Sequence, residues 1–189
     1  YINGQSLTGI WAVRSLGIDP ATGQEKFLKV NGTETFTWDA ADKIFAGDLS
    51  PKWIGSFGTS VSVKNISAGI YFNYQSGAKY YNQTLADRLE NADLTYNVDS
   101  RAANNRWKQT GDNALSKQLS LNGMITSPTY ATTRFVESND FINCSAISVD
   151  YAVPQNIIQK IKAKSVKLCF IANNVFRTGN KSFERGIYY

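Results

Sequence analysis

The residues with the greatest capacity for chemistry lie in one polar stretch that mixes aromatic, amide and charged side chains. It covers residues 80–118 and reads YYNQTLADRLENADLTYNVDSRAANNRWKQTGDNALSKQ. Aromatic rings can stack on a polar ligand such as a glycan, while amide and guanidinium groups hydrogen-bond to its edge. Alternatively, these side chains pack the stretch itself. The residues that we predict to face a ligand or a binding partner are Tyr80, Tyr81, Tyr96, Arg101, Arg106 and Trp107.

The remaining titratable residues do not form a pattern that indicates catalysis. The chain contains no histidine, so the commonest general base and metal ligand are both missing. Cys144 and Cys169 stand outside any CxxC spacing and predict neither a zinc site nor a disulfide framework. Acidic residues scattered among arginines are typical of a solvated, ion-paired loop. The acidic residues in question are Asp87, Glu90, Asp93 and Asp99. We therefore expect no enzyme activity and no cofactor or metal.

The composition favours β structure and argues against a nucleic-acid partner. The 189 residues include 14 Gly, 10 Tyr, 10 Phe and 4 Trp, against one Met and four Pro. This balance is typical of strands joined by turns. The formal charge of +5 comes from Lys and Arg interleaved with Asp and Glu, so no basic patch is expected.

Two consecutive runs of residues alternate in the two-residue period of a β-strand, separated by a tight turn at Lys64-Asn65. Each has about ten residues, the length that a tilted strand needs to cross a bilayer. A soluble antiparallel sheet with one buried face would give the same alternation. The expected apolar face comprises Trp53, Phe57, Val61 and Val63 in the first run and Ala68, Ile70, Phe72 and Tyr74 in the second.

Two further strands are predicted in residues 134–154 and 166–176, joined by a basic linker over residues 155–164. Ile142 and Cys144 have the opposite parity to the apolar residues that follow them. Either a β-bulge near Ser145-Ala146 restores the pattern, which we favour, or these two side chains point to the polar face. In this register Cys144 pairs with about Asn174, too far from Cys169 for a disulfide, so both thiols are predicted to be free.

A polar hairpin is predicted near the N-terminus. A turn at residues 19–23 is followed by two β-leaning runs, 25–30 and 33–38, which flank Asn31-Gly32, a dipeptide typical of a type I′ turn. Neither run has a clean apolar face. The hairpin is therefore either the edge of a larger sheet or a loop in water.

Four stretches, in order, resemble the C-terminal part of the SusC/RagA family of TonB-dependent outer-membrane transporters: YINGQSLTGIWAVRSLGIDPATGQEKFL (1–28), AGDLSPKWIGSFGTSVSVKNISAGIYFNYQSGAKYYN (46–82), RFVESNDFINCSAISVDYAVP (134–154) and SVKLCFIANNVFRTGN (165–180). The resemblance implies an all-β fold, in which antiparallel strands form the C-terminal part of a transmembrane β-barrel with 22 strands in the family. Residues 1–189 would be a partial barrel, without plug or remaining strands, and with long external loops at about 17–52 and 78–132. At residues 187–189 the chain departs from the family's usual ending.

The resemblance also implies a function, which is the uptake of polymer-derived nutrients, either oligosaccharides or peptides, across the bacterial cell outer membrane. The implied partners are outer-membrane lipid, a SusD-like surface lipoprotein that acts as a lid, and the TonB complex through an N-terminal part that this chain lacks. Short connections face the periplasm in such barrels, so Lys64-Asn65 and residues 155–164 should lie at one end, with the Asp19 hairpin and residues 78–132 at the other. The alternative is a soluble β-sandwich adhesin or glycan-binding module, whose apolar faces would meet a second sheet about 10 Å away.

Overall fold

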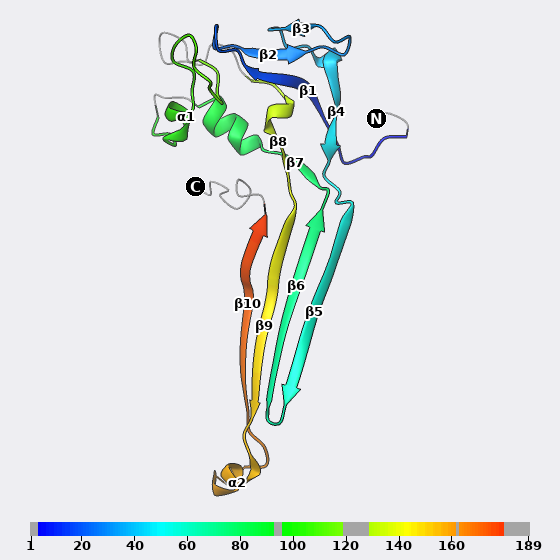
Figure 1. Cartoon of the computed structure of the whole chain (residues 1–189), viewed down its shortest axis with the longest axis vertical. Helices are drawn as coiled ribbons and strands as arrows, with labels where there is room; N and C mark the ends of the chain where they lie inside the picture. The colour runs from blue at the N-terminus through cyan, green and yellow to red at the C-terminus, as the bar shows by residue number, and fades with distance from the viewer. Residues whose placement is uncertain (1–3, 93–95, 119–128, 162, 180–189) are drawn as a thin grey trace. The chain divides into compact units, whose positions relative to one another are not determined.

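The computed structural model describes residues 4–92, 96–118, 129–161 and 163–179, which fall into two compact units (Figure 1). We call the described residues of Tyr1–Ser50 and Lys79–Ser138 the loop unit, and those of Pro51–Ala78 and Asn139–Glu184 the strand unit. Residues 187–189, where the sequence departs from the resemblance, lie outside the described residues. No helix in the described part of the chain is long and apolar enough to cross a membrane.

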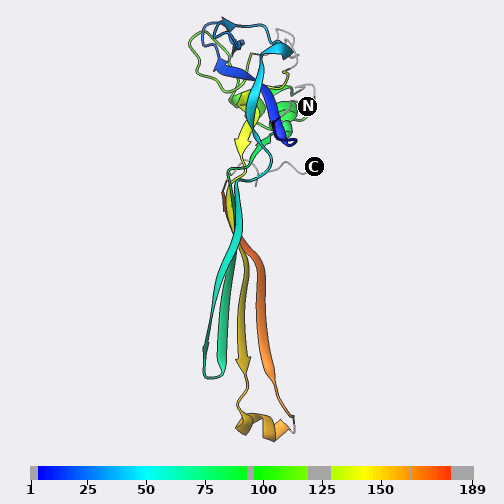
Figure 2. The same ribbon diagram turned by 90° about the vertical axis from the view of Figure 1, so that its right-hand side faces the viewer.

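The strand unit is one antiparallel sheet of four long strands in the order β10-β9-β6-β5, side by side in Figures 1 and 2. The strands are β5 (Trp53–Val63), β6 (Ile66–Ser76), β9 (Phe141–Ala152) and β10 (Lys167–Gly179). All four predicted strands are confirmed. The turn at Lys64-Asn65 is also confirmed, since Val63 pairs with Ile66 across it. The predicted linker contains two short helices, α2 (Gln155–Ile158) and η4 (Gln159–Ile161).

Cross-strand pairing aligns the predicted apolar faces. Phe57 lies opposite Phe72, Phe72 opposite Cys144, and Cys144 opposite Phe176. The Phe57 and Phe72 rings stack at 5.1 Å between centroids, and the Phe176 ring meets Phe72 edge-on at 6.2 Å. Most large side chains of this face are nevertheless exposed; Trp53 keeps 71% and Phe170 65% of its surface open to solvent. The face is thus continuous, apolar and uncovered within the described residues.

A bulge at Ser145 explains the change of parity along β9. Tyr71 pairs with Ala146 and Phe72 with Cys144, which leaves Ser145 as the extra residue, and its hydroxyl donates to the Tyr71 carbonyl at 3.1 Å. The predicted bulge is confirmed, and Cys144 therefore lies on the apolar face. Side chains alternate strictly between the two faces of a strand. One extra residue therefore moves all the following side chains to the opposite face, and this restores the apolar pattern.

The strand β10 carries an irregularity of its own at the same level. Asn173 pairs with Ala146 and Phe176 with Cys144, so two residues of β10 stand opposite Ser145, and one of them, Asn174, has a φ of +50°. The predicted partner of Cys144 was consequently wrong by two residues. Both cysteines are free thiols, as predicted.

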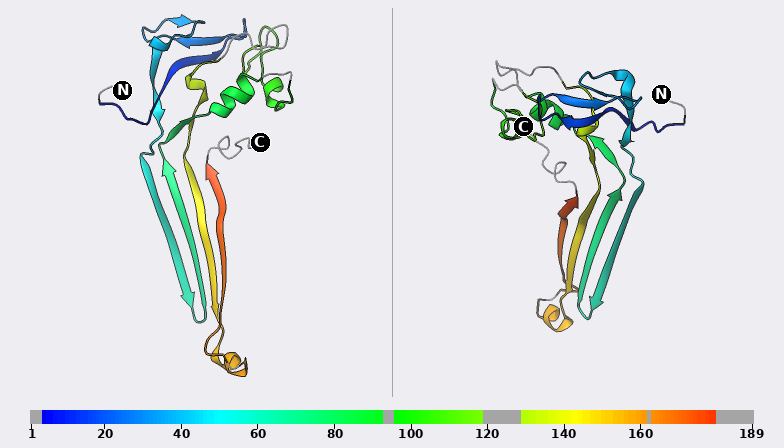
Figure 3. Two further views of the ribbon diagram at one scale, coloured as in Figure 1. Left: turned by 180° about the vertical axis from the view of Figure 1, so that it is seen from behind. Right: turned by 45° about the horizontal axis from the view of Figure 1, so that its top comes forward.

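The loop unit contains a second antiparallel sheet in the order β3-β2-β1-β4, with β1 between β2 and β4, and a separate β7-β8 pair (Figure 3). The strands are β1 (Gly9–Ile18), β2 (Glu25–Leu28), β3 (Glu34–Thr35), β4 (Lys43–Asp48), β7 (Lys79–Tyr81) and β8 (Val136–Ser138). Its short helices are η1 (Ala40–Asp42), η2 (Leu85–Glu90), α1 (Arg101–Asn104) and η3 (Thr133–Phe135).

The predicted hairpin is formed by β2 and β3 at the edge of this sheet. Of the two alternatives, it is therefore the edge of a larger sheet and not a separate loop in water. Its loop differs from a type I′ turn, because only Gly32 has a positive φ, of +84°. The Gly32 amide donates to the Lys29 carbonyl at 3.0 Å, and the Lys29 amide donates to the Thr33 carbonyl at 2.9 Å. This is the three-residue loop that ends in one left-handed glycine. The hairpin also buries Phe27, so it has more of a core than its sequence indicates.

Candidate functional site

The loop unit is held together by a buried cluster of three charged side chains. Arg134, at η3, donates from Nη2 to Glu25 Oε2 at 2.8 Å and to Glu90 Oε1 at 2.9 Å. Its Nε and Nη1 groups donate to the other oxygens of the same two carboxylates, each at 3.2 Å. Glu25 is 6% and Glu90 1% exposed. The cluster therefore joins β2, η2 and η3, three segments that are far apart in the sequence.

The electrostatics keep this cluster ionised. Burial by itself would raise the pKa of Glu90, but the hydrogen bond and charge of Arg134 outweigh it and lower that pKa below its ordinary value. Burial would also lower the pKa of Arg134, yet Glu90 and Glu25 raise it above its ordinary value. A general acid or base needs a pKa near the working pH. The cluster is therefore suited to holding structure rather than to moving protons.

Arg106, one of the predicted ligand-facing residues, is buried in the same unit. It is 4% exposed, and its guanidinium donates to the carbonyls of Ala102 at 2.8 Å, Lys117 at 2.9 Å and Leu89 at 2.5 Å. A guanidinium offers five N–H donors, so one side chain can tie several stretches of chain together. These contacts correspond to the alternative in which the stretch packs on itself.

Trp107 also makes contacts within the unit. Its Nε1 donates to the Pro20 carbonyl at 2.9 Å, and its ring lies over Gly23, where a Cβ would come within 2.5 Å of the ring. Gly23 has a φ of +68°, so both its backbone and the neighbouring ring favour glycine at this position. Trp107 thus holds the Asp19 turn, in which Thr22 Oγ1 donates to Asp19 Oδ2 at 2.7 Å.

The other predicted residues lie at separate places in the loop unit. The Tyr80 hydroxyl donates to Glu137 Oε2 at 2.5 Å, and the Tyr81 ring meets Phe135 edge-on at 6.0 Å. Tyr96 is 74% exposed. Arg101 donates to Asp99, and this hydrogen bond lowers the pKa of the Asp99 carboxyl to about 2. Of the acidic residues, Asp93 lies outside the described residues.

Two pockets open in the loop unit, and sequence reasoning identified neither. The first, of about 440 Å³, has leucine walls with Glu90, Arg134 and Arg101 among the lining residues. The second, of about 460 Å³, is lined by aromatic residues that include Trp38 and Tyr130, whose rings lie 4.7 Å apart. The available signal was the recurrence of aromatic residues after the hairpin, which alone does not predict a pocket.

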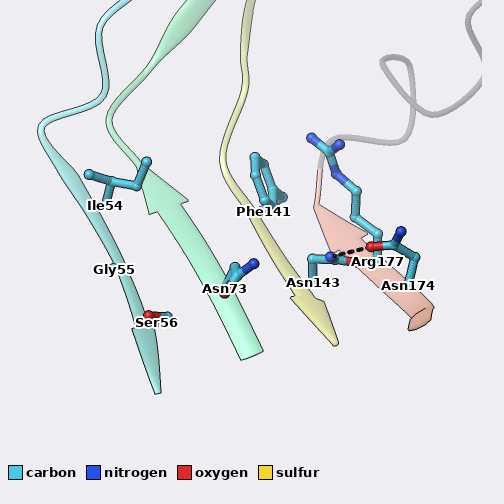
Figure 4. Close-up of a pocket in the computed structure, with 8 residues that line it drawn as sticks. All are labelled: Ile54, Gly55, Ser56, Asn73, Phe141, Asn143, Asn174 and Arg177. Atoms are coloured by element: carbon cyan, nitrogen blue, oxygen red, sulfur yellow. Dashed lines mark hydrogen bonds between the residues drawn. The ribbon is translucent and has the colours of Figure 1, made fainter. Parts of the chain in front are cut away.

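The strand unit has a hollow of about 710 Å³ on its polar face, shown in Figure 4. Asn143 Nδ2 donates to Asn174 Oδ1 at 3.2 Å within it. The Arg177 guanidinium carbon lies 3.8 Å from the centre of the Phe141 ring. The sequence signal for this hollow is the position of Asn73 on the polar face of its strand, which by itself does not indicate the neighbouring strands. Its lining residues are Ile54, Gly55, Ser56, Asn73, Phe141, Asn143, Asn174 and Arg177.

An antiparallel sheet with one apolar and one polar face, and a short turn at one end, has the features expected of a barrel segment. No protein-family model matches the sequence, and no curated protein is detectably similar to it. Solved structures do match. The structure of the RagAB peptide importer in the "open-open" state is similar at a TM-score of 0.73 with 17% identity, covering 95% of this chain and 20% of that chain.

Two further structures give the same result. The RagAB peptide importer in the "closed-closed" state matches at a TM-score of 0.72, and the RagAB peptide transporter matches at 0.77. Each is 17% identical and covers 90% of this chain and 19% of that chain. This chain therefore spans about a fifth of the length of the chains that it matches. The likeness confirms the predicted fold, antiparallel strands arranged as in part of a RagA-type transporter.

Proposed function

We propose that this chain is part of a SusC/RagA-type TonB-dependent importer that takes up polymer-derived nutrients across the outer membrane. The observation that carries the proposal is the two-faced sheet of the strand unit, in a fold that matches the RagAB importer over 95% of the chain. The apolar face would contact lipid and the polar face would line an aqueous interior. Lys167 of β10 and Asp150 of β9 form an ion pair of 3.1 Å across a diagonal, since Lys167 pairs with Ala152 and Asp150 with Cys169, and both would then stand in water.

The alternative, a soluble β-sandwich, receives less support from the structure. A sandwich requires a second sheet packed on the apolar face at about 10 Å. Trp53, Phe57 and Phe170 of this face are more than half exposed within the described residues. A lipid environment would remove this apolar surface from water without any further sheet.

The partners and substrate follow from the same proposal. A SusD-like surface lipoprotein would cover the loop unit, and the TonB complex would act through a part of the protein that this chain does not contain. The substrate is an oligosaccharide or a peptide. The solved structures of similar fold are those of a peptide importer, and this favours a peptide as the substrate.

The proposal predicts energised uptake that depends on the full-length protein. Bacteria that lack its gene should take up a fluorescently labelled oligosaccharide or peptide digest at background rate, and the restored gene should recover uptake. Collapse of the proton gradient should abolish the recovered uptake, because TonB-dependent import draws on that gradient. Recovered uptake that is unaffected by an uncoupler would contradict the proposed mechanism.

The orientation of the connections gives a second prediction. In intact cells, a cysteine introduced at the exposed Asn113 in the loop unit should react with a membrane-impermeant maleimide. A cysteine at Gln159, in the connection between β9 and β10, should stay protected until the outer membrane is broken. The reason is that short connections face the periplasm and long loops face outwards. Equal labelling at both positions in intact cells would show that this assignment of sides is wrong.

A further inference from the structure

An apolar row crosses all four strands of the strand unit at the end that carries the Lys64-Asn65 turn. Val63 pairs with Ile66, Ile66 with Tyr151, and Tyr151 with Leu168. These four side chains lie on the apolar face of the sheet, and Val63 is 62% and Leu168 60% exposed within the described residues. In the proposed barrel, this row is the last part of the lipid-facing surface before the strands end.

The two connections at this end are joined through backbone hydrogen bonds. The Ala152 amide donates to the Asn65 carbonyl at 2.8 Å, which ties β9 to the turn between β5 and β6. The Val153 amide donates to the Val166 carbonyl at 2.9 Å, which closes the base of the connection between β9 and β10. The turn and the connection with α2 therefore lie together at one end of the sheet (Figures 1 and 2).

This end of the strand unit is positively charged. Residues 61–66 contain one lysine and residues 151–166 contain three, and neither range contains Asp or Glu. Lys64, Lys160 and Lys164 are exposed, and none of them forms an ion pair with another described residue. A cluster of lysines without carboxylates attracts an anionic surface or headgroup.

The short helix α2 adds an exposed apolar side chain beside these lysines. Ile158 is 2% exposed, whereas its neighbour Ile157 is 49% exposed. A segment that combines exposed apolar and cationic side chains is suited to a membrane interface. The apolar side chain enters the acyl region there, and the long lysine side chains reach the headgroups. The end of the sheet thus combines the two features that recognise an anionic lipid.

We propose that this end of the strand unit binds an anionic phospholipid of the periplasmic leaflet. The headgroup phosphate lies among Lys64, Lys160 and Lys164, and the acyl chains lie on the apolar row. Lys167 is not part of this site, because it forms an ion pair with Asp150 at 3.1 Å. The inference rests on the part of the proposed function that places this sheet in the outer membrane with its short connections towards the periplasm.

The test uses the full-length transporter, purified in detergent, and native mass spectrometry during titration with dioleoylphosphatidylglycerol or dioleoylphosphatidylcholine. The double variant Lys160→Gln with Lys164→Gln should bind one phosphatidylglycerol molecule fewer, with the affinity at that site reduced by about tenfold or more. Its binding of phosphatidylcholine should be unchanged. The matched control, Lys29→Gln with Lys108→Gln, removes two charges from the loop unit and should change neither.

Two further measurements test the turn and the acyl chains separately. Lys64 has a φ of +53°, a conformation that asparagine adopts readily, so Lys64→Asn should preserve the turn. This variant should weaken phosphatidylglycerol binding by about fivefold. Glycerol 3-phosphate carries the headgroup charge without acyl chains, and it should displace the lipid at least about a hundredfold less efficiently than phosphatidylglycerol does.

Several results would overturn the proposal. They are unchanged phosphatidylglycerol binding in the lysine variants, an equal loss in the control, and displacement by glycerol 3-phosphate at the concentration of the lipid itself. Unchanged lipid binding together with lost co-sedimentation with isolated peptidoglycan would assign the lysines to an acidic polymer instead. Heat-modifiability in gels would confirm that each variant forms its barrel.

The lipid site and the importer function fail in different measurements. A transporter that shows energised uptake but unchanged lipid binding in the lysine variants would refute the lipid site alone. The expected loss of lipid in a barrel that shows no energised uptake would count against import and leave the lipid site in place.

Discussion

Replacing Arg134 with alanine is expected to lower the free energy of local unfolding of the loop unit by about 3–5 kcal/mol. The substitution would leave the carboxylates of Glu25 and Glu90, 6% and 1% exposed, without the guanidinium that now binds both. A buried charge that has lost its partner keeps its cost of desolvation and gains nothing in return. Amide hydrogen exchange of η2 in the full-length protein would measure the change.

The matched control for this prediction is Arg14→Ala. Arg14 is exposed on β1 of the same sheet, and its loss should change exchange in η2 by less than about 0.5 kcal/mol. A third variant would combine Arg134→Met with Glu25→Gln and Glu90→Gln, which removes all three charges together. This variant should recover part of the lost stability, because it leaves no unpaired buried charge. Equal exchange in Arg134→Ala and Arg14→Ala would show that the cluster does not hold the unit.

Thr59→Arg should destabilise the membrane-inserted protein by about 2–4 kcal/mol, whereas Ser60→Arg should have almost no effect. These residues are adjacent, exposed and close to the middle of β5, but they lie on opposite faces of the sheet. Thr59 pairs with Ile70 on the apolar face, and Ser60 with Gly69 on the polar face. Folding into lipid vesicles during a urea titration would measure both variants. Equal shifts would contradict the assignment of one face to lipid and the other to water.

A separate measurement distinguishes lipid from a second protein sheet as the cover of the apolar face. Trp53 lies on this face and is 71% exposed. Its fluorescence, isolated by replacing every other tryptophan of the full-length protein with phenylalanine, including Trp11, Trp38 and Trp107, should be quenched by lipids brominated in their acyl chains. Unquenched fluorescence would favour the soluble β-sandwich.

The strands and faces of the strand unit could be predicted almost completely, because they depend on residues that are close together in the sequence. Alternation with a period of two determines which side chains share a face, and a turn as short as Lys64-Asn65 sets the register of its two strands. Even the bulge at Ser145 was visible, as a change of parity between Cys144 and Ile147. The second irregularity, at Asn174, was not visible, because it depends on how β10 accommodates its partner.

Most of the candidate sites could not be predicted, for the opposite reason. Glu25, Glu90 and Arg134 are separated by tens of residues, and nothing near any of them in the sequence indicates a common partner. The burial of Arg106 likewise depends on the carbonyls of Lys117 and Leu89, which lie 11 and 17 residues away in the sequence. The sequence alone therefore determined the strands, their two faces and the resemblance to a transporter family, since these are written in short-range patterns. Only the tertiary structure decided which polar side chains are buried and which line a hollow, because burial and pairing are set by residues brought together from distant parts of the chain.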